Sequence, residues 1–124
     1  MAAGIRVMVV DDDETIRRLL QVNLEMEDYS VVLAEDGVDA LAKLRASPVD
    51  LVLLDIMMPN MDGWTVCEEM KADKALRDIP VVFLSARAQD ADIARGVALG
   101  AAYVTKPFDP FDLLELVADL TGTA

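Results

Sequence analysis

The chain has 124 residues, which suits one compact domain whose hydrophobic core needs no disulfide or metal to fold. Apolar residues make up 54% and charged residues 27%, a balance that excludes both a disordered chain and an integral membrane protein. One cysteine, no histidine and a formal net charge of -12 argue against an internal disulfide, zinc or histidine chemistry, and direct binding to nucleic acid.

Short β-branched and aliphatic runs alternate along the chain with segments of helical periodicity. The expected strands, in chain order, are residues 5–10, 30–33, 51–54, 81–84 and 103–105. Three of them are nearly continuous in apolar residues, which is typical of parallel strands covered by helices on both faces. Apolar stripes at helical spacing lie between them, at Ile16/Leu19/Leu20/Leu24, Val38/Leu41/Leu44, Val66/Met70, Ile93/Val97 and Leu113/Leu114/Val117/Leu120.

Five strands alternating with five helices imply βαβ units with right-handed crossovers, and hence an α/β fold with one doubly wound, five-stranded parallel sheet. We find no internal repeat, linker or low-complexity tract, so residues 1–124 are expected to form a single domain. In such a sheet, ligands bind beyond the carboxyl ends of the strands, where the winding direction reverses. The strand ends are therefore the place to search for function.

Polar residues follow four of the five expected strands: Asp11 and Asp12 the first, Asp55 the third, Ser85 the fourth and Lys106 the fifth. If the first and third strands are neighbours, three carboxylates share one pocket. Like charges at short range raise one another's pKa, so a cation normally neutralises such a cluster. Mg²⁺ fits best, because it prefers oxygen ligands and accepts phosphate oxygens, whereas the acidic run leads straight into a helix rather than a calcium-binding EF-hand loop.

A carboxylate beside a metal and a lysine can act as the nucleophile toward a phosphoryl group and form an aspartyl phosphate. Asp55 suits that role best, with Mg²⁺ and Lys106 supplying positive charge and Ser85 a hydrogen bond. Taken singly, an aspartate pair after a strand is more often a helix cap, and a lysine more often a solvated charge. The combination at successive strand ends is what indicates a functional site.

Four short runs resemble the signature of bacterial response regulator receiver domains: Val9–Asp13, Leu54–Gly63, Leu84–Ala86 and Thr105–Phe108. The resemblance covers essentially the whole chain and implies a flavodoxin-like (β/α)5 fold with strand order 2-1-3-4-5. It also implies a phosphorelay partner, either a histidine kinase or a histidine phosphotransfer protein. Phosphorylation would then change the surface formed by the fourth helix, the fifth strand and the fifth helix, and so its affinity for a downstream protein or a fused output domain.

The resemblance implies a role for each matching residue near the acidic cluster. Asp55 would be the phosphoacceptor, Asp12 a direct Mg²⁺ ligand, Asp11 a ligand through water, and the main-chain carbonyl of Met57 a third protein ligand. The side chains of Met57 and Arg87 would flank the approach of the water that hydrolyses the phosphoryl group, and so set its lifetime.

The remaining matches lie at the ends of the last two strands. Ser85 and Lys106 would hold the phosphoryl oxygens, the Lys106–Pro107 bond would be cis, and Tyr103 would be the aromatic residue that swings inward on activation. The other aromatic residues are expected to pack at helix and sheet edges: Trp64, Phe83 and Phe111.

Two other functions stay open. A small metal-dependent phosphohydrolase also uses an aspartyl nucleophile, but such enzymes place a second aspartate two residues later as general acid, where this chain has Met57. A receiver that serves only as a docking module would not need Asp12, Asp55 and Lys106, which are all intact. We expect no enzyme activity beyond the protein's own phosphorylation and dephosphorylation.

Charge and chain ends bear on partners and location. The excess of carboxylates favours basic partners or cations, although solubility also accounts for part of it.

No apolar stretch reaches the roughly 18 residues that cross a bilayer, and Met1–Gly4 does not resemble an export signal. We expect a cytoplasmic protein without membrane contact, monomeric or weakly dimeric on phosphorylation. It resembles a stand-alone receiver, although a domain cut from a longer regulator would look the same.

Overall fold

The computed structural model describes residues 3–86, 89–100 and 102–123, and within them five strands alternate strictly with five helices. In chain order these are β1 (Arg6–Val10), α1 (Glu14–Met26), β2 (Ser30–Ala34), α2 (Gly37–Ala46), β3 (Leu51–Asp55), α3 (Gly63–Ala72), β4 (Val81–Ser85), α4 (Asp90–Leu99), β5 (Ala102–Thr105) and α5 (Pro110–Thr121). Each predicted strand and helix is confirmed, with strand ends that differ by a residue or so. None of the helices in these ranges is long and apolar enough to span a membrane.

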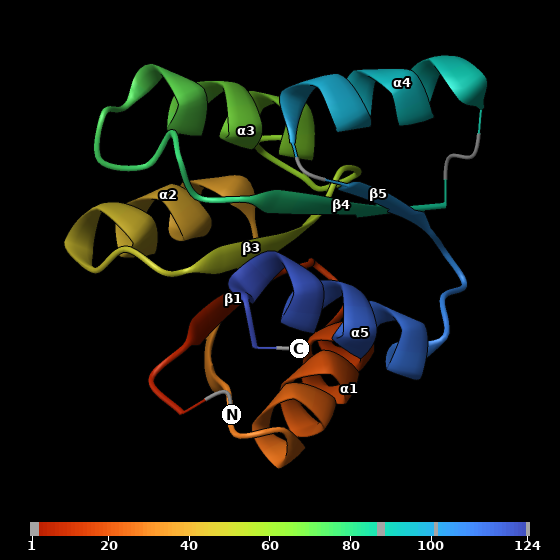
Figure 1. The fold of residues 1–124 in the computed structure, drawn as a ribbon. Coiled ribbons are helices and arrows are strands. Elements are labelled where there is room, and N and C mark those ends of the chain that lie inside the picture. Colours follow the sequence, from red (N-terminus) through yellow and green to blue (C-terminus); the bar gives the residue numbers. More distant parts are fainter. Residues whose placement is uncertain (1–2, 87–88, 101, 124) are drawn as a thin grey trace.

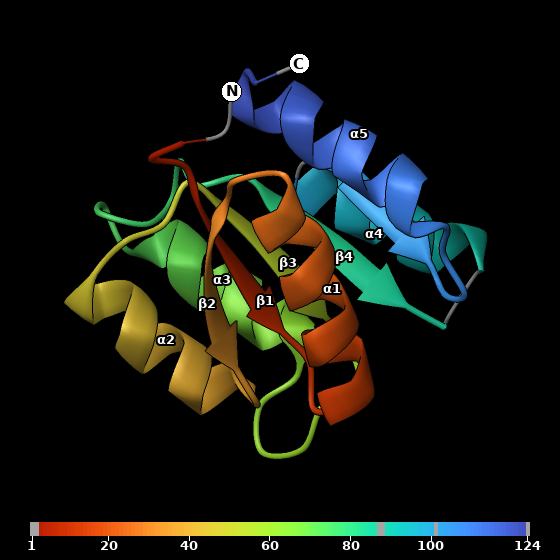
Figure 2. The same cartoon turned by 90° about the horizontal axis from the view of Figure 1, so that it is seen from below.

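The five strands form one parallel sheet in the order β2-β1-β3-β4-β5, as predicted. β1 lies between β2 and β3, with Val10 paired to Ala34 on one side and to Leu54 on the other. Helices α1 and α5 cover one face of the sheet, and α2, α3 and α4 cover the other (Figures 1 and 2). The chain reverses its winding direction at β1 and β3, which therefore end side by side at the edge where ligands are expected.

Two hydrophobic clusters, one on each face of the sheet, form the core. Met8 and Val10 of β1 belong to the cluster under α2 and α3, whereas Val7 and Val9 belong to the cluster under α1 and α5. Successive side chains of a strand point to opposite faces, and here both faces are covered. This arrangement explains why the central strands are continuous apolar runs in the sequence: all five residues of β3 are buried.

Aspartate caps the N-terminus of four of the five helices, and each cap fixes where a helix starts after its strand or loop. In each case a side-chain oxygen accepts a hydrogen bond from a backbone N–H in the first turn: Asp13 from Thr15, Asp36 from Asp39, Asp62 from Thr65 and Asp109 from Phe111. Such a cap contributes about 1 kcal/mol. Because Asp13 caps α1, the two preceding aspartates are not needed for that purpose.

The aromatic residues divide between the core and the surface. Trp64 and Phe83 are buried with ring centroids 4.9 Å apart, which confirms their predicted packing. The same prediction was wrong for Phe111, whose side chain is 76% exposed. The reason is its position on α5: Leu113 and Val117 face the sheet, and a residue two positions before Leu113 points to the opposite side of a helix.

Candidate functional site

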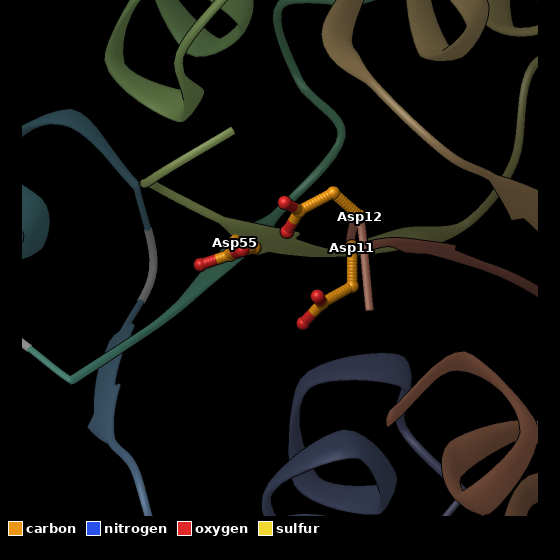
Figure 3. A group of neighbouring side chains, drawn as sticks. All are labelled: Asp11, Asp12 and Asp55. Carbon is orange, nitrogen blue, oxygen red and sulfur yellow. The ribbon is translucent and has the colours of Figure 1, made fainter. Parts of the chain in front are cut away.

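Three carboxylates meet at the carboxyl ends of β1 and β3. Asp11 and Asp12 directly follow β1, Asp55 is the last residue of β3, and one oxygen of each lies within 4.8 Å of the others (Figure 3). Asp11 is fully buried and Asp55 is 5% exposed, whereas Asp12 is exposed at the rim. The structure thus brings together the three carboxylates that the sequence predicted would share a pocket.

The surroundings of Asp55 change the acidity of its carboxyl group. Burial, followed by the negative charge of Asp11, raises the pKa of Asp55 from 3.8 to about 6. The charge of Lys106 and a hydrogen bond from the backbone of Met57 oppose this shift without cancelling it. At neutral pH the carboxylate is therefore ionised but poorly solvated, and a nearby cation would stabilise it.

Lys106 supplies the positive charge nearest to the cluster. Its Nζ lies 2.9 Å from Oδ2 of Asp11 and 3.6 Å from Oδ1 of Asp55. Burial lowers the pKa of Lys106, but the hydrogen bond that its ammonium donates to Asp11 and the charges of both aspartates raise it above 10.5 overall, so the ammonium stays charged at neutral pH. The backbone of Lys106 also donates to the carbonyl of Ser85 at 2.8 Å, which ties the end of β5 to the end of β4.

Backbone and side-chain hydrogen bonds fix Asp11 in place. The N–H of Asp13 donates to Oδ1 of Asp11 at 2.9 Å, and the guanidinium of Arg17 donates to its main-chain oxygen at 2.7 Å. Sequence reasoning missed Arg17. The available signal was a basic residue four positions after the capping aspartate, which is one helical turn and places its side chain back toward the strand end.

The loop between β3 and α3 closes tightly around Asp55. The N–H of Gly63 donates to the carbonyl of Ile56 at 2.8 Å. A Cβ at position 63 would lie 2.5 Å from the main-chain oxygen of Asp55, closer than any side chain tolerates. Glycine is therefore required at the start of α3 so that the helix can approach the strand end that carries the carboxylate.

The other predicted site residues lie around this cluster. Ser85 is the last residue of β4, next to β3, and is fully buried. Met57, in the loop after Asp55, is 60% exposed. The Lys106–Pro107 bond is cis, as the resemblance implied, and Arg87 lies outside the described residues.

Tyr103 lies in β5 beneath α4. Its ring centroid is 6.4 Å from that of Trp64 and 6.4 Å from that of Phe83. An added Cβ at Gly96 of α4 would stand 2.3 Å from the Tyr103 ring. The tyrosine is thus packed between the sheet and α4, and it links the aromatic core to the α4 side of the molecule.

The donor set of the cluster fits a hard divalent cation. Asp11, Asp12 and Asp55 offer only carboxylate oxygens, which Mg²⁺ prefers, and Lys106 offsets one of their three charges. No histidine exists in the chain, and its one cysteine is buried within α3, so neither an imidazole nor a thiolate joins this cluster.

Comparison with known proteins agrees with this geometry. The family model of the response regulator receiver domain matches residues 7–118. The chain is 42% identical over 106 residues to the alkaline phosphatase synthesis transcriptional regulatory protein PhoP of Bacillus subtilis, covering 85% of this chain and 43% of PhoP. It is 44% identical over 117 residues to the response regulator PleD of Caulobacter vibrioides, covering 94% of this chain and 26% of PleD.

Two solved structures have the same architecture. The receiver domain of the Francisella response regulator 1452 is 29% identical with a TM-score of 0.89, and the alignment covers 96% of this chain and 98% of that one. The chemotaxis response regulator CheY4 of Vibrio cholerae is 29% identical with a TM-score of 0.87, covering 94% and 98%. The chain spans less than half of the length of PhoP but nearly all of these two structures. It belongs to the response regulator receiver domains of two-component systems, whose general function is to accept a phosphoryl group.

Proposed function

We propose that Asp55 is the residue that accepts the phosphoryl group, from a histidine kinase or a histidine phosphotransfer protein. The observation that carries the proposal is the position of its carboxylate. It ends a central strand, lies within 4.8 Å of the carboxylate oxygens of Asp11 and Asp12, and is 3.6 Å from the ammonium of Lys106. Burial and the negative charge of Asp11 raise the pKa of the Asp55 carboxyl to about 6.

In the transfer, a carboxylate oxygen of Asp55 attacks the phosphorus of the phosphohistidine. The new O–P bond forms as the P–N bond breaks, and the electron pair of that bond returns to the imidazole nitrogen of the donor. Lys106 and the hydroxyl of Ser85 would hold the phosphoryl oxygens. Since only the ionised carboxylate is a nucleophile, the reaction requires a pH above about 6 unless a cation lowers the pKa of Asp55.

Mg²⁺ would be held by Asp12 and Asp55 directly, by Asp11 through water, and by the main-chain carbonyl of Met57. When bound, this ion supplies positive charge that offsets the three carboxylates and the incoming phosphoryl oxygens. Lys106 alone leaves the cluster with an excess of negative charge, which supports a requirement for the ion.

We further propose that the added charge, roughly -1.5 to -2 at neutral pH, is read out on the face formed by α4, β5 and α5. Tyr103 would couple the phosphorylation site to that face, because it belongs to β5 and its ring packs against α4. The reader would be a downstream protein or a fused output domain. Met57 and Arg87 would set the phosphoryl lifetime, and the protein would catalyse no reaction besides its own phosphorylation and dephosphorylation.

In this proposal, residues 1–124 act as one domain in the cytoplasm, monomeric or weakly dimeric on phosphorylation. Acetyl phosphate with MgCl₂ tests the chemistry without a kinase, with intact mass as the readout. We expect one added phosphoryl group in the wild type, none in Asp55→Asn, and none when EDTA replaces MgCl₂. An adduct that survives in Asp55→Asn would overturn the assignment of Asp55.

A further inference from the structure

A groove of about 460 Å³ lies between α5 and the turn that follows α1, and we call it the α1/α5 groove. The two helices lie side by side on one face of the sheet (Figures 1 and 2). Tyr29 and Thr123 line the groove and are joined by a hydrogen bond of 2.8 Å between their hydroxyls. Both helices start near the edge with the acidic cluster and end at the opposite edge of the sheet (Figure 2). The part of the groove between the turn after α1 and the end of α5 is therefore remote from Asp55.

Three carboxylates line the groove without any cation among its lining residues. Glu27 and Asp28 belong to the turn after α1, and Glu115 lies on α5; all three are exposed. In the part of the chain that the structure describes, no ion pair involves any of them. The arginines of α1 are used elsewhere, since Arg17 bonds the main chain of Asp11 and Arg18 lies 3.6 Å from Glu14.

The ends of the two helices add to this negative potential. A helix C-terminus carries about half a negative charge, which basic residues in the last turn commonly offset. Neither α1 nor α5 has a basic residue in its last turn. In addition, Asp28 has φ 69°, a left-handed conformation in which glycine is the favoured residue after a helix. Glu27 and Asp28 thus lie at the negative end of the α1 dipole, and Asp28 also has the backbone conformation that favours glycine.

An apolar strip on α5 completes the groove. Phe111, Leu114 and Ala118 lie one helical turn apart, and the ring of Phe111 is 76% exposed. An exposed aromatic ring beside uncompensated carboxylates matches the side chains of lysine and arginine, whose stems are apolar and whose heads are cationic. The groove therefore offers both halves of a surface for a cationic, amphipathic ligand.

We propose that the α1/α5 groove binds a basic amphipathic segment of a partner protein. Its lysine or arginine side chains would lie over Glu27, Asp28 and Glu115, and an apolar side chain would pack against Phe111. A second copy of this chain does not fit, because α5 with its cap carries carboxylates and no lysine or arginine, so two such faces repel. The proposal is independent of the phosphoacceptor chemistry of Asp55.

Titration with a defined probe tests the proposal on the complete chain. The probe is a short fluorescein-labelled helical peptide with arginines on one face and leucines on the other, and its control replaces the arginines by glutamates. We expect saturable binding of the basic peptide only, by fluorescence anisotropy. We also expect amide shift changes in NMR spectra centred on Tyr29, Ala118 and Thr123, and binding that persists in Asp55→Asn.

Variants separate the groove from general acidity. The double variant Asp28→Asn/Glu115→Gln removes two groove charges. We expect each of the two substitutions to weaken binding about two- to fivefold. The matched control, Glu35→Gln with Asp78→Asn, removes two exposed charges elsewhere and should leave binding unchanged. Phe111→Ser should weaken binding more than Val97→Ser, which alters an exposed apolar residue of α4.

Four outcomes would overturn the proposal. They are absence of saturable binding, equal losses in the groove and control variants, amide shifts centred on residues 11, 12 and 55, and self-association of the unliganded protein through Tyr29 and Ala118.

Discussion

The ammonium of Lys106 donates a 2.9 Å hydrogen bond to Asp11, a fully buried carboxylate that lies 95 residues earlier in the chain. The same ammonium is 3.6 Å from Asp55. One cation at the end of β5 thus pairs with two carboxylates at the ends of β1 and β3, and it reduces the repulsion between them in the unphosphorylated protein.

Lys106→Met is expected to lower the free energy of unfolding by about 1–3 kcal/mol at neutral pH in EDTA, because it leaves a buried carboxylate without its cation. Urea denaturation measures the change. The control is Lys43→Met, which removes an exposed i,i+4 pair with Asp39 and should cost less than about 1 kcal/mol. Equal losses in the two variants would show that the Lys106 pair is no stronger than a surface pair.

Stability should depend on pH through Asp55. Its pKa is 3.8 ordinarily and about 6 in the folded protein, so between these values the folded state binds the proton more readily than the unfolded state. The contribution of Asp55 to stability therefore falls as pH rises through this window, and the loss is complete above about pH 6. Asp55→Asn, which cannot ionise, should gain about 1–3 kcal/mol relative to wild type between pH 4 and pH 7 in EDTA.

Urea denaturation across that pH range measures the gain. Asp78→Asn, which alters an exposed site away from the cluster, is the control. A stability difference between Asp55→Asn and wild type that does not vary with pH would contradict the raised pKa.

Magnesium binding should change the fluorescence of Trp64. This is the chain's one tryptophan, and it lines a pocket of about 400 Å³ together with Asp12 and Met57, two of the proposed ligand residues. A titration with MgCl₂ should give a saturable change in emission. Asp12→Asn should weaken the affinity for Mg²⁺ about tenfold or more, because loss of even a group that supports a metal ligand costs that much. Glu35→Gln, the control, should leave the affinity for Mg²⁺ unchanged. A titration that Asp12→Asn leaves unaltered would remove Asp12 from the ligand set.

Gly96→Ala should destabilise the protein although alanine is the better helix former by about 1 kcal/mol. The new Cβ would stand 2.3 Å from the Tyr103 ring, so the ring must move, at a cost of about 1–3 kcal/mol. In a Tyr103→Ala background the same substitution should instead stabilise. Thermal unfolding of the four proteins in this double-mutant cycle measures the coupling, and a stabilising Gly96→Ala in the wild-type background would show that α4 does not rest on Tyr103.

Features that depend on the local order of apolar and polar residues were predictable from the sequence. The continuous apolar run at β3 indicated a strand buried on both faces, and the polar residues after the strands located the site, because parallel strands end at one edge. The parallel α/β fold predicted on these grounds is confirmed, whereas the strand order that brings Asp11, Asp12 and Asp55 together was implied by the family resemblance. Their roles in phosphoryl transfer stay predictions.

Features that depend on how helices pack were not predictable. Periodicity did not reveal that the second residue of α5 points away from the sheet, so Phe111 was predicted to pack at a helix or sheet edge although it is exposed. Nor did sequence show that Arg17 reaches back to Asp11, or that Arg95 of α4 lies 4.4 Å from the ring of Trp64. These contacts depend on rotamers and helix positions that no single residue specifies.

The most direct test of the phosphoacceptor assignment is to map the modified residue. After treatment with acetyl phosphate and MgCl₂, borohydride reduces an aspartyl phosphate to homoserine, and tandem mass spectrometry of the digested protein locates that residue. We expect homoserine at position 55 and unmodified aspartate at positions 11 and 12. Homoserine at 11 or 12, or at no position in a protein that has gained a phosphoryl group, would contradict the assignment.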